Sequence, residues 1–272
     1  MDYTNLISPA LGIFIGTLMG LTGAGGGILS VPLLVFTLHL EVATAGPIAL
    51  SAIALAAGVG AFLGLKAKIL RYKAAGLMAI FGLMLSPFGL WAAQRVPNAP
   101  LLISFSMLLV FVSIRLFIQA RNESKGYPTK KPPPPPCLLD PSIGKLIWTV
   151  PCARSLVIAG ALAGFLSGLL GVGGGFIIVP ALKKYTNLPM KSVVATSLGV
   201  LAIISTGGAL LSALTGSLNL TIAAPFALGV LAGLLLGKLL ETRISGTGIQ
   251  QIFSIFTMMV AIGLLIKGIA GL

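Results

Sequence analysis

The main functional groups that this chain offers are backbone N–H groups. They become available at a glycine-rich segment that occurs twice. Residues 20–34 read GLTGAGGGILSVPLL and residues 168–182 read GLLGVGGGFIIVPAL, with nine of the fifteen positions identical at a constant offset of 148. In each copy the glycines interrupt an apolar stretch, so the helix after the break begins with unpaired N–H groups and its positive dipole end. These glycines are Gly23, Gly25, Gly26, Gly27, Gly171, Gly173, Gly174 and Gly175.

The paired breaks predict a binding site for an anion. Helix N-termini bind anions, and two such ends could face one central anion. Glycine-interrupted apolar segments at matching positions of two halves also indicate the substrate site of a transporter. Tight helix packing through small residues is the alternative explanation of the same glycines.

Hydroxyl groups follow the second break and are candidate substrate ligands. Thr196 and Ser197 lie in the middle of the next apolar run, whereas Ile48 and Ala49 hold the equivalent positions of the first half, with Ser51 nearby. Each hydroxyl could donate to an oxyanion. The alternative is that each bonds back to its own helix, as Ser and Thr commonly do in membrane helices.

Acidic residues are absent from the apolar runs, which limits the other kinds of chemistry. The acids fall in loops or at the ends of apolar runs, so no buried carboxylate is available to carry a proton or sodium ion. The sequence contains no cluster of metal ligands, no nucleophile with a base and no phosphate-binding loop, and it predicts no enzyme, cofactor or metal ion. The acids are Asp2, Glu41, Glu123, Asp140 and Glu241.

The composition places these groups in a polytopic membrane protein. Apolar residues make up 57% of the chain and charged residues 8%, with a mean hydropathy of +1.07. Soluble domains carry roughly 25% charged residues. The net charge of +13 lies mainly in short loops between apolar runs, as expected for charges that orient helices during insertion. We therefore predict the lipid bilayer, and no nucleic acid, as a partner.

Ten apolar segments predict an all-α fold built from two repeats. In each repeat the opening stretch is too long for one helix and too short for two full spans, so we predict a hairpin of two short helices, followed by three transmembrane helices. The repeats would occupy residues 1–120 and 155–272, with a linker at 121–154. The predicted helical segments are 6–22, 27–38, 45–65, 74–93, 101–119, 155–170, 175–185, 192–213, 222–240 and 249–267.

Basic residues predict that the two repeats are inverted. A hairpin opening gives each repeat an odd number of passages, and only Arg95 and Lys267 of the 18 Lys and Arg residues then lie outside the cell. A single-pass opening would move Lys183, Lys184, Lys191, Lys238 and Arg243 outside and Lys267 inside. The positive-inside rule favours the inverted arrangement, with both termini outside.

The linker is the one long polar stretch. Residues 132–136 are five consecutive prolines, which predict an extended polyproline II spacer on the cytoplasmic face. A ligand for a proline-binding domain is the alternative. The two cysteines, Cys137 and Cys152, indicate no disulfide framework, and we interpret them as free thiols.

The repeated motifs resemble those of the TauE/SafE sulfite exporter family, also called TSUP permeases. The resemblance rests on GLTGAGGGILSVP, GLLGVGGGFIIVP and the segment ATSL at 195–198, and it covers the chain outside 121–155. It implies a carrier in the bacterial inner membrane that moves sulfite, sulfoacetate, thiosulfate or related organic anions, mostly outward. The chain departs from the family pattern at Ile48 and Ala49.

Three functions fit these observations. The first is a secondary transporter of a small sulfur oxyanion or organosulfonate that works by alternating access. The second is a channel-like anion facilitator, or a permease for another small organic anion. The third is a membrane scaffold in which the glycines serve packing alone.

Overall fold

The computed structural model of the chain describes residues 3–22, 26–124, 135–139, 146, 148–241 and 246–270. These residues form helices joined by short loops, so the predicted all-α class is confirmed. In chain order the elements are α1 (Tyr3–Thr22), the 3₁₀ turn η1 (Gly26–Leu29), α2 (Ser30–Thr37), α3 (Val42–Lys66), α4 (Tyr72–Arg95), α5 (Asn98–Ser124), α6 (Val150–Leu170), α7 (Gly175–Tyr185), α8 (Met190–Leu214), α9 (Leu220–Glu241) and α10 (Gly246–Ala270).

Long apolar helices make up most of the described chain. Seven of its helices are long and apolar enough to cross a membrane, namely α3, α4, α5, α6, α8, α9 and α10. Their outward faces carry large apolar side chains such as Phe62, Phe88 and Leu239, each more than three-fifths exposed. An apolar surface of this extent requires a lipid environment.

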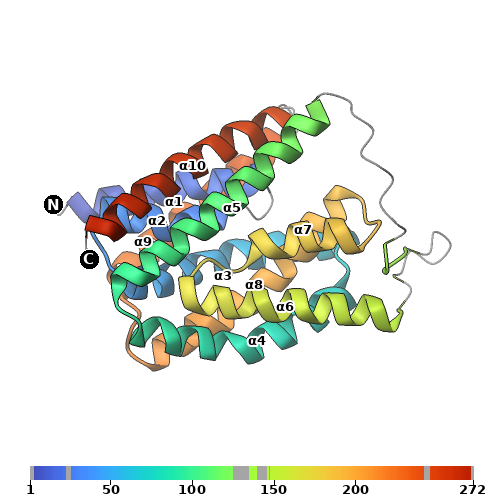
Figure 1. The fold of residues 1–272 in the computed structure, drawn as a ribbon, viewed down its shortest axis with the longest axis horizontal. Helices are drawn as coiled ribbons and strands as arrows, with labels where there is room; N and C mark the ends of the chain where they lie inside the picture. The colour runs from blue at the N-terminus through green and yellow to red at the C-terminus, as the bar shows by residue number, and fades with distance from the viewer. Residues whose placement is uncertain are drawn as a thin grey trace.

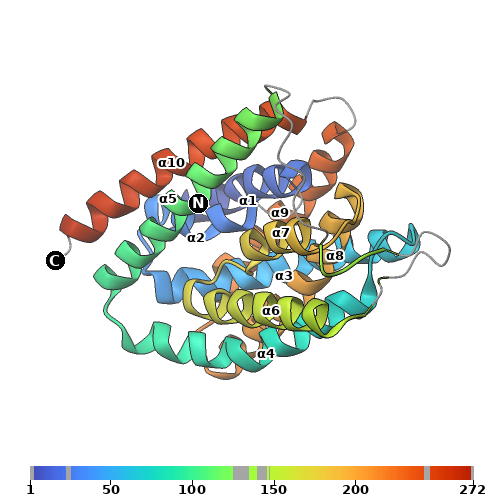
Figure 2. The same ribbon diagram turned by 45° about the vertical axis from the view of Figure 1, so that its right-hand side comes forward.

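The helices pack in pairs that join the first half of the chain to the second. The offset of 148 makes α6 the equivalent of α1, and α9 the equivalent of α4. In the structure α1 packs along α9, α4 along α6, α3 along α8 and α5 along α10. Exchanging the two halves therefore reproduces the same set of pairs. In Figure 1 and Figure 2 the α4–α6 and α5–α10 pairs lie on opposite sides of the bundle, with α3 between them.

Glycines bring two of these pairs into backbone contact. A Cβ placed on Gly160, Gly164 or Gly168 of α6 would collide with the backbone of α4 at Met78, Gly82 and Ser86, respectively. These contacts advance along both helices, so α4 and α6 run parallel. The α1–α9 pair has the same arrangement, in which Gly12, Gly16 and Gly20 face the backbone of α9 from Phe226 to Gly237. We call these two contacts the glycine seams.

The central pair, α3 and α8, runs antiparallel. A Cβ on Gly64, near the end of α3, would lie 2.9 Å from Cβ of Ala195, near the start of α8. At the other end of the pair, a Cβ on Gly208 would lie 2.9 Å from Cδ1 of Leu50. These two equivalent helices thus point in opposite directions, and the inversion of the whole repeats stays a prediction. Their orientation across a membrane stays a prediction.

The opening hairpin of each half differs from the prediction in its first arm. We expected two short helices, but α1 and α6 contain 20 and 21 residues, and only the second arms, α2 and α7, are short. The helix α6 begins five residues before the apolar run because Thr149 caps it. The Thr149 hydroxyl accepts a hydrogen bond from the Cys152 N–H at 3.3 Å, and Pro151 occupies the first turn.

The free-thiol interpretation of the cysteines is wrong for this structure, in which Cys137 and Cys152 form a disulfide. The linker returns to the bundle at this point, where the Cys137 N–H donates to the Tyr185 carbonyl at 3.0 Å. That contact holds Cys137 at the end of α7, and the disulfide joins it to the first turn of α6. Two cysteines without a secretory context carry no sequence signal for such pairing. The predicted polyproline run falls largely outside the described residues, at 132–134.

The glycine seams make a first prediction about stability. Gly164→Ala should lower the free energy of unfolding by about 1–3 kcal/mol, because its Cβ would collide with the backbone of Gly82. Gly76→Ala in α4 is the matched control, since a Cβ there meets nothing within 4 Å. Thermal unfolding in detergent measures both. Equal melting temperatures for the two variants would contradict the seam.

Membrane orientation gives a second prediction. Glu41 and Lys191 are exposed, and they lie at the starts of the antiparallel helices α3 and α8. In a Cys137→Ser, Cys152→Ser background, Glu41→Cys should react with an impermeant maleimide from outside the cell, and Lys191→Cys only after the cytoplasmic side is opened. Reaction of both from outside would rule out inverted repeats. Several basic residues behind this orientation, Lys125, Lys130, Lys131, Lys145 and Arg243, lie outside the described residues.

Candidate functional site

The second glycine break is a left-handed turn between α6 and α7. Gly171, Gly173 and Gly174 have φ angles of 71°, 72° and 76°, which side-chain-bearing residues rarely adopt. Gly171 closes α6 by donating its N–H to the Ser167 carbonyl at 2.8 Å. Gly174 is the N-cap residue of α7, and Gly175 is its first residue. The helix therefore breaks between Gly171 and Gly174, as the sequence predicted.

The first break has a different local form. Gly23 and Gly25 lie outside the described residues. Gly26 and Gly27 begin the 3₁₀ turn η1, which leads directly into α2. The second arm of each half is therefore a short helix whose N-terminus starts at a glycine break, and that arm is α2 preceded by η1 in the first half and α7 in the second.

The two breaks meet near the middle of the central α3–α8 pair. A Cβ on Gly27 would lie 3.4 Å from the Val172 carbonyl oxygen and 3.2 Å from Cδ1 of Ile53. A Cβ on Gly173 would lie 3.1 Å from Cγ2 of the same Ile53 and 2.8 Å from Cδ2 of Leu201. Ile53 and Leu201 are about eleven residues from the starts of their 25-residue helices. We call this meeting point the central site.

The dipoles of the two short helices favour negative charge at the central site. Their N-terminal ends lie there, and neither Leu29 nor Gly174 provides a side-chain cap. Their C-terminal ends point away and carry cations. Lys183 and Lys184 occupy the last turn of α7, while the Lys267 ammonium of α10 donates to the Val35 carbonyl of α2 at 2.9 Å. The negative C-terminal ends of α2 and α7 are thus offset by cations, whereas their positive N-terminal ends meet at the central site.

The hydroxyls predicted as ligands make hydrogen bonds within the protein. Ser51 donates to the Ile48 carbonyl at 2.7 Å, and Ser197 donates to the Val194 carbonyl at 2.8 Å. The Thr196 hydroxyl accepts the Arg71 backbone N–H at 3.1 Å. Ser51 is two residues from Ile53 and Ser197 is four from Leu201, so both lie within about one turn of the central site.

The sequence analysis overlooked Ser205, whose hydroxyl lies closer to the break. A Cβ on Gly173 would be 3.1 Å from the Ser205 hydroxyl oxygen, which is fully buried and has no hydrogen-bond partner among the described residues. Ser30 and Ser167 also carry buried hydroxyls that lack a partner in that part of the chain. Buried polar groups are normally satisfied, so these three hydroxyls are candidates for binding a ligand or water.

A sequence signal for these serines existed. Ser30 lies inside the first copy of the repeated segment, and Ser167 immediately precedes the second copy. Ser205 follows Ser197 by eight residues, which keeps it on the same broad side of α8. Proximity to a glycine break was the feature that could have identified these serines as candidates.

The fold and the central site define a class of protein. Seven candidate spans within the described chain, together with two half-length helices that meet at glycine breaks, describe a polytopic membrane protein of the kind that binds solutes at broken helices.

Comparison with known proteins gives the family. The family model "Sulfite exporter TauE/SafE" matches residues 9–264, and the chain belongs to this family. A "Probable membrane transporter protein" of Xylella fastidiosa (strain Temecula1) is 29% identical over 94% of this chain and 93% of its own length. The "Probable membrane transporter protein YjnA" of Bacillus subtilis (strain 168) is 26% identical over 90% of this chain and 93% of its own length. No solved structure matches the chain. The protein is thus a membrane transporter, and the predicted resemblance is confirmed.

The cation at the end of α2 makes a third prediction. Lys267→Met should lower the melting temperature, because it leaves the Val35 carbonyl without its donor and the negative end of α2 without a cation. A hydrogen bond from a charged group contributes about 1.5–3 kcal/mol. Lys66→Met is the control, since Lys66 is an exposed cation in the last turn of α3. Equal losses in the two variants would show that the contact with α2 contributes nothing.

Proposed function

We propose that the protein is a secondary transporter that carries a small sulfur-containing oxyanion out of the cell. The family description names sulfite, and sulfoacetate and thiosulfate extend the proposed substrate class. The observation that carries the proposal is the convergence of two uncapped helix N-termini beside the unpartnered hydroxyl of Ser205. Such a site favours an anion, and none of its described residues carries a carboxylate to oppose it.

The proposed ligands are the N–H groups at the two breaks and the nearby hydroxyls. Backbone at Gly26 and Gly27 would bind from one side, and backbone at Gly173, Gly174 and Gly175 from the other. Gly23, Gly25 and Gly171 would allow the chain to turn. Ser205 adds a donor that was not predicted from sequence. Ser51 and Ser197, about one turn away, would have to release their carbonyl acceptors to donate, and Thr196 lies further along α8 beside the Arg71 N–H.

Alternating access would use the paired halves. Residues 1–120 and 155–272 form the two proposed units, inverted in the bacterial inner membrane with both termini outside and the 121–154 linker in the cytoplasm. The glycines of the central site are buried, so rocking of one unit against the other would open it to either side. Glu41, Glu123 and Glu241, the acids in the described chain, lie at helix ends. Export would then be driven by the membrane potential, worth about 2.3 kcal/mol per charge at 100 mV.

Flux into proteoliposomes tests this function. With labelled sulfite, thiosulfate or sulfoacetate, a carrier saturates and is accelerated by substrate on the opposite side of the membrane. Flux that rises linearly with concentration would instead assign a channel-like facilitator. Absence of flux for every small anion tried would leave the scaffold explanation.

The central site makes a fourth prediction. Ser205→Ala should weaken substrate binding about tenfold or more, because a hydrogen bond to a charged group contributes about 1.5–3 kcal/mol. It should leave the melting temperature unchanged or higher, since no protein hydrogen bond is lost. Ser212→Ala is the matched control on α8: Ser212 is equally buried, but its hydroxyl donates to the Gly208 carbonyl at 2.8 Å. Normal binding by Ser205→Ala would remove this serine from the site.

A further inference from the structure

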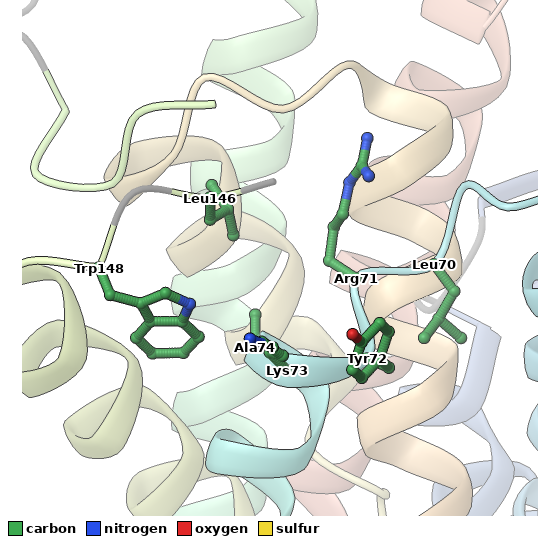
Figure 3. Close-up of a pocket in the computed structure, with 7 residues that line it drawn as sticks. All are labelled: Leu70, Arg71, Tyr72, Lys73, Ala74, Leu146 and Trp148. Carbon is green, nitrogen blue, oxygen red and sulfur yellow. The ribbon is translucent and has the colours of Figure 1, made fainter. Parts of the chain in front are cut away.

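We infer a second anion site at the end of the bundle where α4 and α8 begin. A cavity of about 210 Å³ lies between the α3–α4 loop and the part of the linker that precedes α6 (Figure 3). It would hold a small soluble organic oxyanion, such as a sulfonate with a short apolar group. We call it the loop cavity, and its lining residues are Leu70, Arg71, Tyr72, Lys73, Ala74, Leu146 and Trp148.

Charge is the first reason for this assignment. Arg71 and Lys73 flank the start of α4, where the helix dipole is already positive. The first turn of α4 contains no acid, Arg71 as N-cap provides no side-chain cap, and none of the described lining residues carries a carboxylate. Cations at a helix N-terminus oppose the dipole, and a bound anion removes this repulsion.

The second half of the chain provides an internal comparison. Its equivalent loop has the same backbone: Gly216 takes the positive φ of Lys68, and Ser217 donates to the Ser212 carbonyl as Ile69 donates to that of Gly64. At the positions of Arg71 and Lys73, however, that loop has Asn219 and Thr221. The loop therefore forms without the two cations, so its backbone requires neither Arg71 nor Lys73, and their excess at this end matches the predicted cytoplasmic side.

The cavity walls are held in place on both sides. On the loop side, the Arg71 N–H donates to the Thr196 hydroxyl at 3.1 Å and the Leu70 N–H to the Gly64 carbonyl at 3.2 Å. On the linker side, the Thr149 hydroxyl next to Trp148 donates to the Pro136 carbonyl at 3.0 Å, and the adjoining Cys137–Cys152 disulfide attaches this segment to α6. Binding to walls that are already fixed costs less ordering entropy.

The lining also indicates the kind of anion. Leu70, Leu146 and the ring of Trp148 contribute apolar surface to the lining, and in Figure 3 Leu146 and Trp148 lie across from Arg71. The volume is below the roughly 300–1,000 Å³ of sites for drug-sized ligands. A compact anion that joins an oxyanion group to a few carbon atoms fits both properties. Its role as an entry site for the transported anion rests on the proposed function, whereas binding itself does not.

Trp148 provides the test. In Trp91→Phe protein purified in detergent, Trp148 is the single tryptophan, and propane-1-sulfonate should change its fluorescence in a saturable way. Arg71→Gln and Lys73→Gln should each raise the Kd about fivefold or more, since each removes one charge contact. Lys73 is exposed, so its variant leaves the packing intact, and the control is Lys66→Gln, an exposed cation outside the cavity.

The outcomes separate this site from the central one. Ser205→Ala should keep the fluorescence response whether or not it loses flux. Loss of transport can therefore be distinguished from loss of binding in the loop cavity. No saturable response, or an unchanged Kd in Lys73→Gln and Arg71→Gln, would overturn the assignment. A response to phosphatidylglycerol in nanodiscs but not to propane-1-sulfonate would assign the cavity to a lipid headgroup and likewise overturn it.

Discussion

The glycine seams are the constraint on which the rest of the structure depends. Through them the first helix of each half packs backbone to backbone on the fourth helix of the other half, α1 on α9 and α6 on α4. Neither half could bury its own first helix. Close approach of this kind replaces the hydrophobic driving force, which is weak between helices already surrounded by lipid.

Positioning of the central site follows from the seams. Both α1 and α6 end at a glycine break, so the register of each seam determines where the following short helix begins. Gly168 is fixed against Ser86, and three residues later the chain turns back at Gly171 toward Ile53. A shift of one turn along α4 would move the break by about 5.4 Å and separate the two positive helix ends.

Much of the fold could be predicted from the sequence, because lipid imposes length and apolarity on each helix. The long helices extend the predicted segments by one to five residues at their polar ends, where hydropathy carries no signal but a cap such as Thr149 does. The breaks were predictable from glycine, since few other residues adopt φ near +70°. The pairing of α1 with α9 could not be predicted, because a contact between distant segments leaves no periodic pattern in the sequence of either segment. The Cys137–Cys152 bond and the position of Ser205 depend on that same long-range packing.

The two halves agree in backbone and differ in polar side chains. Ser205 corresponds to Ala57, Thr196 to Ile48 and Arg71 to Asn219 at the offset of 148. The paired helix dipoles are thus nearly symmetric, whereas the hydroxyls near the central site are concentrated on α8. The backbone sets the sign of charge that the site favours, and the side chains of α8 would orient what binds there. The linker disulfide adds a further difference, and it conflicts with the predicted cytoplasmic side because such bonds persist mainly in oxidising compartments.

The exchange of partners across the halves also determines the order in which the protein can assemble. Helix α1 is synthesised before α9, and the surface that receives it is made roughly 200 residues later, which is about 10–40 s at a synthesis rate of 5–20 residues per second. For that interval the glycine face of α1 is covered by lipid or by the insertion machinery. Inserted α1 thus waits for α9 before it can dock, and this undocked helix is the intermediate that quality control in the membrane would meet.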